Sequence, residues 1–212
     1  MGPAEGLLNP ETGWSERLLC GKLAPMTVDI GEHTALIIID VQKAFDNPAL
    51  GRRDNPDAEA NIGALVAAWQ ANGRPMVRVA HTDDDPSSAF AEGAPGHAFK
   101  PVVADLEPTL DMRKDVHSAF HGTPDLHGWL LEQGIDQFVI CGIQTNRCCE
   151  STARDGGDLG YDVIFVPDAM HTFDKIGPDG VPYAAEQLGA ATAATLHGYF
   201  ATVTTTKELL GG

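Results

Sequence analysis

The feature that most constrains the fold is an alternation of short apolar runs with segments of helical periodicity. The first run, residues 34–39, is rich in β-branched side chains and ends at Asp40, as expected for a strand buried on both faces of a parallel sheet. Apolar residues between 58 and 69 then recur at helical spacing, and Asn72-Gly73 ends the pattern. A second apolar run at 75–81 completes a strand, helix and strand unit.

This alternation continues to the end of the chain. Further strands are predicted at 111–116, 138–143, 161–166 and 200–204, and further helices at 123–134, 147–159 and 182–197. Strands joined by helices of about 10 to 15 residues imply right-handed crossovers and parallel pairing. The sequence therefore predicts an α/β fold of three layers, in which helices cover a doubly wound sheet of about six mainly parallel strands.

The length and composition fit one folded domain behind an N-terminal extension. A chain of 212 residues with 43% hydrophobic content can bury one sizeable core, and no change of composition marks a second domain. Residues 34–212 are assigned to this domain. Residues 1–33 mix glycine, proline and charge without clear periodicity, although Trp14, Leu18 and Leu19 are spaced for a short docking helix. This extension is a candidate arm for oligomer assembly.

The charge distribution limits the partners. The net charge is −16, and 14 basic residues are scattered among 30 acidic ones, whereas a nucleic-acid surface needs clustered lysine and arginine. No stretch approaches the roughly 20 apolar residues of a membrane span, and the first residues lack the order of a secretory signal. We therefore expect no nucleic-acid partner, no membrane partner and a cytoplasmic location.

A cysteine at a strand-to-helix turn is the strongest candidate for chemistry. Cys148 follows the apolar run 138–143, at the point where a helical pattern begins. A helix N-terminus presents unpaired N–H groups and a partial positive charge, which favour the thiolate that attacks carbonyl carbon. We therefore expect Cys148 to be a nucleophile. Cys141 and Cys149 are interpreted as packing residues, and no disulfide scaffold is expected.

Two charged residues are placed to meet this thiol. In doubly wound sheets, ligands bind beyond the carboxyl ends of the strands, where the strand order reverses. Asp40 ends the first strand and Lys114 lies near the end of the third, so both are expected at the edge that Cys148 occupies. The carboxylate can take the thiol proton and return it to a leaving nitrogen, while the ammonium steadies the carboxylate and the developing charge. Backbone N–H groups at the helix start can hold the oxyanion of the tetrahedral intermediate.

Three ordered motifs between residues 34 and 210 resemble those of the isochorismatase-like cysteine hydrolases. They are Asp40-Val41-Gln42 with Phe45, Lys114 with Ser118-Ala119-Phe120, and Gly142-Ile143-Gln144-Thr145-Asn146-Arg147-Cys148. The resemblance implies that Asp40, Lys114 and Cys148 form a triad that cleaves a C–N bond of a small amide, ureide or lactam through a thioester, without a cofactor. It also implies a cis peptide bond between Ile143 and Gln144, with the N–H groups of Gln144 and Cys148 aimed at the oxyanion.

The substrate pocket is expected at the same edge, beneath the long connection at 82–108. The candidate substrate-binding residues are Phe45, Phe120, Arg147 and His171. Arg147 is suited either to pair with a substrate carboxylate or to support the helix that follows. The resemblance further implies a homo-oligomer, either a dimer or a tetramer, and the alanine-rich helix at 182–197 offers a flat face for such packing.

Two other functions stay open. Nicotinamidase-like members of the family carry an Asp-x-His pair after the second strand, whereas this chain has His81-Thr82-Asp83 with His97 downstream. His81, Asp83 and His97 are candidate metal ligands, but lone histidines more often serve as hydrogen-bonded loop or core residues, so no metal is expected. One alternative is a metal-assisted amidase, and the other is a non-catalytic binding or assembly module. True isochorismatases, which cleave a vinyl ether, lack a cysteine at this turn, so the resemblance favours the amide-cleaving branch.

Overall fold

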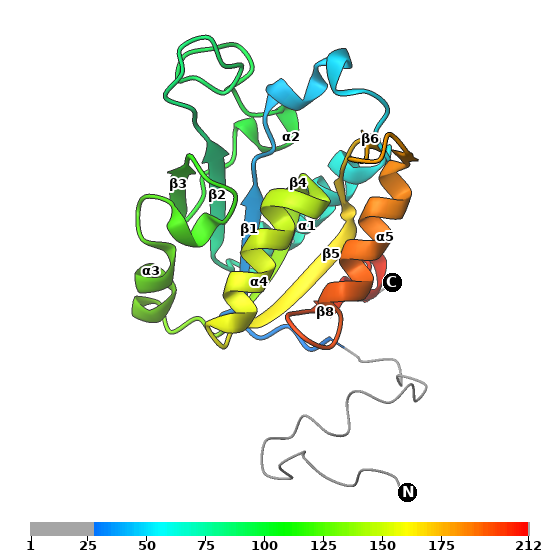
Figure 1. The fold of residues 1–212 in the computed structure, drawn as a ribbon. Coiled ribbons are helices and arrows are strands. Elements are labelled where there is room, and N and C mark those ends of the chain that lie inside the picture. Colours follow the sequence, from blue (N-terminus) through cyan, green and yellow to red (C-terminus); the bar gives the residue numbers. More distant parts are fainter. Residues whose placement is uncertain (1–27, 212) are drawn as a thin grey trace, which may run out of the picture.

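A six-stranded parallel sheet forms the centre of the computed structural model, which describes residues 28–211 (Figure 1). Its strands are β1 (Ala35–Ile39), β2 (Met76–His81), β3 (Leu110–Lys114), β4 (Gln137–Ile143), β5 (Asp162–His171) and β8 (Thr202–Val203). They lie in the order β3-β2-β1-β4-β5-β8, and every neighbouring pair runs parallel. The predicted doubly wound sheet is confirmed. The docking helix predicted near Trp14 falls outside the described residues.

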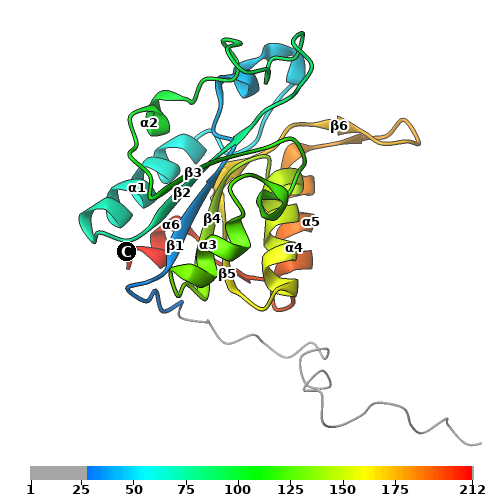
Figure 2. The ribbon, with the colours of Figure 1, turned by 90° about the vertical axis from the view of Figure 1, so that its left-hand side faces the viewer.

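Helices cover both faces of the sheet and complete the three layers (Figure 2). One face carries α1 (Ala58–Ala71), α2 (Pro101–Ala104) and α6 (Thr206–Leu209), and the other carries α3 (Leu126–Glu132), α4 (Glu150–Asp158) and α5 (Ala185–Leu196). Side chains of β1 alternate between the two cores: Leu36 and Ile38 pack with α1, while Ile37 and Ile39 pack with α3 and α4. Because both faces are buried, this strand has no polar position. Within residues 28–211, no helix combines the length and apolar character needed to cross a membrane.

The strand order reverses between β1 and β4, and a glycine allows these two strands to come together. Gly142 of β4 has φ +132°, and a Cβ there would overlap the carbonyl oxygen of Ile39 and lie 2.7 Å from the Ile39 nitrogen. A side chain is therefore excluded at this position. The carboxyl ends of β1 and β4 lie side by side as a result, at the place where doubly wound sheets bind ligands.

The long connection after β2 is held against the residues that follow β1. The side-chain amide of Gln42 donates to the carbonyl oxygens of His81 and His97, at 3.0 and 2.9 Å, and accepts from the His81 N–H at 2.9 Å. The backbone N–H of Lys43 also donates to the carbonyl of Ala98 at 2.9 Å. This connection therefore folds over the carboxyl edge of the sheet, meaning the edge where the strands end, instead of extending into solvent.

A short antiparallel hairpin was not predicted from the sequence. β6 (Lys175–Ile176) pairs with β7 (Pro182–Tyr183), and the hairpin projects from the body beside α5 (Figure 2). The helix predicted at 182–197 begins only at Ala185, because its first residues belong to β7. The turn residues Gly177-Pro178-Asp179-Gly180 are a sequence signal for such a chain reversal, and they were missed.

Candidate active site

Asp40, Lys114 and Cys148 meet at the carboxyl edge of the sheet, next to the reversal of strand order. All three are buried, with 0%, 3% and 7% of their surface exposed. Lys114 Nζ donates to Asp40 Oδ2 at 2.6 Å, so the ammonium and the carboxylate form a buried ion pair. The charges of both residues act on the Cys148 thiol, which lies beside them. The structure thus brings together the three residues that the sequence placed at this edge.

Lys114 reaches Asp40 from two strands away. β3 is separated from β1 by β2, which corresponds to about 10 Å at the usual strand spacing. Lys114 is in register with His81, the last residue of β2, and its Nζ lies 3.4 Å from His81 Nδ1. A long side chain is needed to span this gap, which explains why a lysine stands at the end of β3.

Two unusual backbone turns carry the carboxylate and the thiol. Asp40 has φ +52°, in the left-handed region that aspartate tolerates better than most side chains, so the chain turns sharply as it leaves β1. After β4, the Ile143–Gln144 peptide bond is cis, and Thr145–Cys149 forms a π-helical turn that leads into α4. The Thr172 hydroxyl donates to Asn146 Oδ1 at 2.6 Å and ties this turn, called the Cys148 turn below, to the end of β5.

The Cys148 thiol is protonated at neutral pH, so the expectation of a thiolate was wrong. Burial, followed by the negative charge of Asp40, raises the pKa of the Cys148 thiol to about 12, and Lys114 opposes this shift only in part. The helix α4 begins at Glu150, so the thiol lies in the preceding turn. The thiol therefore needs a base. Asp40 Oδ1 is buried and has no hydrogen-bond partner among the described residues, which leaves it able to accept the thiol proton.

Phe45 belongs to an aromatic cluster beside the Cys148 turn. Its ring centroid lies 5.1 Å from that of Phe90 and 6.4 Å from that of Phe173, and Ile143 joins the same cluster. This arrangement makes one apolar wall next to the cis peptide bond. Phe90 and Phe173 were not singled out from the sequence, because both lie outside strands and helices, where apolar periodicity gives no signal.

Phe120, a predicted substrate-binding residue, packs against the core from the loop that follows β3. Its ring packs against Phe138 and Tyr161, at centroid distances of 6.0 and 5.8 Å, in the core on the α4 face of the sheet. Phe120 lies in a single turn of 3-10 helix, Ala119–His121, whose apolar side faces this core. The ring is partly buried, and these aromatic contacts hold one side of it against the core.

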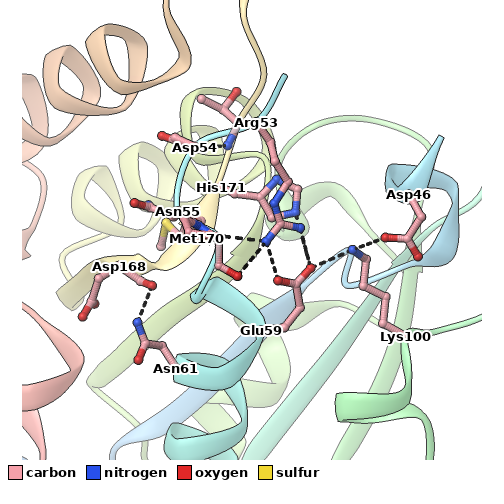
Figure 3. Close-up of polar contacts among 12 residues, drawn as sticks. Asp46, Arg53, Asp54, Asn55, Glu59, Asn61, Lys100, Asp168, Met170 and His171 are labelled. Atoms are coloured by element: carbon pink, nitrogen blue, oxygen red, sulfur yellow. Dashed lines mark hydrogen bonds and ion pairs between the residues drawn. The ribbon is translucent and has the colours of Figure 1, made fainter. Parts of the chain in front are cut away.

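His171, another predicted substrate-binding residue, lies inside the fold. Its fully buried ring lies between Phe173, at a centroid distance of 5.3 Å, and Glu59 of α1 (Figure 3). Glu59 is bound there by Arg53 and Lys100, at 2.5 and 2.8 Å. Burial and the positive charges of Arg53 and Lys100 lower the pKa of the His171 imidazole to about 3, although Glu59 opposes them. The His171 ring faces this ion-pair network, whereas Thr172, the next residue, faces the Cys148 turn.

Acid is expected to destabilise the protein through His171. The pKa of His171 is about 3 in the folded state. Because an unfolded histidine titrates near 6.5, the unfolded chain binds a proton that the folded chain rejects as pH falls through this window. Stability present above pH 6.5 is then lost, by about 2 kcal/mol at pH 5.

The variant His171→Leu tests this expectation by urea unfolding at pH 7 and pH 5. The wild type should lose about 2 kcal/mol more unfolding free energy between the two values than the variant does. Equal losses in the two proteins would contradict a neutral, buried imidazole at this position.

The candidate metal ligands do not form one set. His81 Nε2 lies 3.0 Å from Asp83 Oδ1, whereas His97 Nε2 lies 3.0 Å from Thr82 Oγ1. Across residues 28–211, no group of three histidine, cysteine, aspartate or glutamate side chains is arranged to hold a metal ion. The other ring nitrogen of His81 faces Lys114.

A histidine without an assigned role lies at the thiol. His117 is exposed, and its Nδ1 lies 3.7 Å from Cys148 Sγ. Arg147, which is also exposed, is close enough for its charge to act on His117, so it lies at the solvent side of the site. His117 stands between Lys114 and the Ser118-Ala119-Phe120 motif, but no spacing rule links it to Cys148.

Thr152 of α4 joins the loop that follows β3, which carries His117, to the Cys148 turn. Its buried hydroxyl donates to the Cys148 carbonyl oxygen at 2.8 Å and accepts from the Ala119 N–H at 3.0 Å. Thr152→Val leaves that N–H buried without a partner, so the unfolding free energy in urea should fall by about 1–3 kcal/mol. Thr152→Ser keeps the hydroxyl and should retain most of this stability. Equal losses in the two variants would contradict the role of the hydrogen bonds.

The fold and the site together define a class. A doubly wound sheet with buried ionisable groups at its reversal of strand order is an α/β domain with an enzyme-type site at the carboxyl edge. Residues 34–208 match the isochorismatase domain family. The chain therefore belongs to the isochorismatase family.

Similar proteins agree with this family. The isochorismatase family protein YrdC of Bacillus subtilis (strain 168) is 37% identical over 179 residues, which cover 84% of this chain and 95% of that protein. The ureidoacrylate amidohydrolase RutB of Azorhizobium caulinodans is 28% identical over 203 residues, which cover 79% of this chain and 87% of that protein. The crystal structure of a cysteine hydrolase from Pseudomonas syringae pv. phaseolicola superposes with a TM-score of 0.80 and 26% identity, covering 91% of this chain and 97% of that one.

Proposed function

We propose that this protein is a cysteine hydrolase that cleaves the C–N bond of a small amide, ureide or lactam, with Cys148 as the nucleophile. The observation that carries the proposal is a buried thiol beside an ion pair in which Asp40 Oδ1 has no partner among the described residues and Lys114 holds Oδ2. The amidohydrolase RutB and the cysteine hydrolase of P. syringae support the bond type and the nucleophile, respectively.

In the proposed first half-reaction, Asp40 Oδ1 takes the proton of the thiol as Sγ bonds to the carbonyl carbon. Lys114 stays charged and holds the carboxylate in place. Asp40 then gives the proton to the leaving nitrogen, the C–N bond breaks, and a thioester on Cys148 remains. The backbone N–H groups of Gln144 and Cys148 are the proposed donors to the oxyanion.

Release of ammonia from a panel of small compounds tests the proposal. The panel contains ureido acids, nicotinamide and small carbamoyl compounds, and streptothricin is added with a mass measurement as its readout, because a lactam opens without releasing ammonia. The wild type should turn over at least one of them, Cys148→Ala should not, and Cys149→Ala should. Cys149 is the matched control because it is a neighbouring thiol with 0% of its surface exposed, packed in the core. Turnover by Cys148→Ala at the rate of the wild type would refute the proposal, and loss on chelation would favour the metal-assisted alternative.

A further inference from the structure

The Cys148 sulfur has two proton acceptors beside it, and they differ in their access to solvent. Asp40 is 0% exposed, and Lys114 occupies its Oδ2. His117, by contrast, is exposed, and its Nδ1 lies 3.7 Å from Sγ. Hydrolysis of a thioester requires a water molecule from solvent at the carbon that is bonded to this sulfur. His117 therefore lies on the side from which that water arrives.

The surroundings of His117 keep its imidazole neutral, as a base must be. Partial burial and the charges of Lys114, Arg147 and His81 lower the pKa of His117, and Asp40 opposes them. With its proton on Nε2, the neutral ring presents the lone pair of Nδ1 toward the sulfur.

The loop that carries His117 is fixed on both sides. Before it, Lys114 is anchored in the buried ion pair with Asp40. After it, Ser118 is buried and its hydroxyl accepts from the Phe120 N–H at 3.3 Å, while the Ala119 N–H is bound by Thr152. The imidazole is therefore presented to the thiol by a constrained backbone, which favours a role in catalysis over a chance contact.

We propose that His117 is a catalytic residue of the second half-reaction, in which it acts as the general base for thioester hydrolysis. This inference rests on the proposed function and adds a residue to it. Nδ1 takes a proton from water as the water oxygen bonds to the thioester carbonyl carbon. The bond between that carbon and Sγ then breaks, and the sulfur takes the proton that the imidazolium received from water. The acid is released, and both side chains return to their starting states.

Acylation by p-nitrophenyl acetate separates the two half-reactions in the full-length chain. Release of p-nitrophenolate in the first turnover reports acetylation of Cys148, and the steady rate that follows reports hydrolysis of the acetyl thioester. In His117→Gln, one equivalent should be released at close to the wild-type rate, and the steady rate should then be about 100-fold lower. Intact mass should show the acetyl group accumulating on Cys148 in this variant.

His121→Gln is the matched control, because His121 is an exposed histidine of the same loop that contacts Asp155, at 3.3 Å, and not the thiol. Its steady rate should equal that of the wild type. The pH profile gives a second readout that a structural role would not move. The wild-type hydrolysis rate should fall as pH drops through the pKa of His117, and Arg147→Gln should move this limb to higher pH, because it removes a positive charge beside the imidazole.

The outcomes separate this inference from the proposed function. Equal steady rates in His117→Gln and the wild type would overturn the role of His117 and leave Cys148 as the nucleophile. A limb that stays at the same pH in Arg147→Gln belongs to another group and would overturn it as well. Failure of p-nitrophenyl acetate to acetylate Cys148 in the wild type, with Cys148→Ala as reference, would overturn the proposed function and this inference together.

Discussion

Asp40→Asn is expected to slow acylation of Cys148 by about 10²- to 10⁴-fold, the usual contribution of a general base. Asparagine has the same shape and also tolerates a positive φ, so the turn at φ +52° is preserved. Its side-chain oxygen can still accept from Lys114. A neutral amide cannot, however, take the proton of a thiol whose pKa is raised to about 12. The first-turnover release of p-nitrophenolate measures this rate.

Asp46→Asn serves as the control for this prediction. Asp46 follows the same turn after β1, but its side chain is 59% exposed and binds Lys100. This variant should acylate at the wild-type rate. Acylation in Asp40→Asn within about tenfold of the wild type would exclude Asp40 as the base, because that change falls short of the contribution expected of one.

Lys114→Met is expected to lower the unfolding free energy by about 3–5 kcal/mol, because it leaves the Asp40 carboxylate buried without a counter-charge. Burial lowers the pKa of the Lys114 ammonium, but its interactions with the Asp40 carboxylate and the Cys148 sulfur outweigh burial, and the pKa is raised. The contribution of the pair is therefore fully present below the ordinary lysine value of about 10.4 and is lost only as pH rises through the higher folded value. Guanidinium unfolding at pH 7 measures the loss.

The double variant Asp40→Asn with Lys114→Met shows whether the uncompensated charge is the cause. Removing both charges should recover most of the stability that Lys114→Met loses, while acylation stays slow. Methionine is long and flexible enough to fill the space that the Lys114 side chain occupies between β3 and Asp40, so little of the loss in unfolding free energy should come from packing. A double variant as unstable as Lys114→Met alone would contradict this explanation.

The fold was accessible from the sequence because its strands are buried on both faces. The run from Ala35 to Ile39 has no polar residue, and the helical spacing in α1 has the correct period, so each element could be recognised locally. The end of such a strand also marks the edge where ligands bind. Asp40, Lys114 and Cys148 could therefore be placed at one edge before any contact was known, although the choice of Lys114 depended largely on the resemblance.

The missed features depend on tertiary contacts. The raised pKa of the Cys148 thiol comes first from burial, which no local pattern reports. The contact between His117 and Cys148 joins residues that are 31 positions apart. The surroundings of His171 differ from the prediction for a different reason: the strand predicted at 161–166 continues as β5 to His171, past a shift in its register with β4 between Ile140 and Gly142.

Lys114 stands on the outermost strand of the sheet, so the proposed reaction depends on a strand at the margin of the domain. β3 is the last strand in the order, so no strand pairs with its outer side. Among the described residues, the backbone hydrogen bonds on that side are the two that Arg113 and Thr123 exchange, at 2.9 and 2.8 Å. Margins of sheets open with less free energy than their centres. Brief opening of β3 would break the ion pair and withdraw the Lys114 ammonium from Asp40, while the turn that carries the Cys148 sulfur stays folded. We therefore expect the proposed activity to be lost on warming at a temperature below that at which the whole domain unfolds.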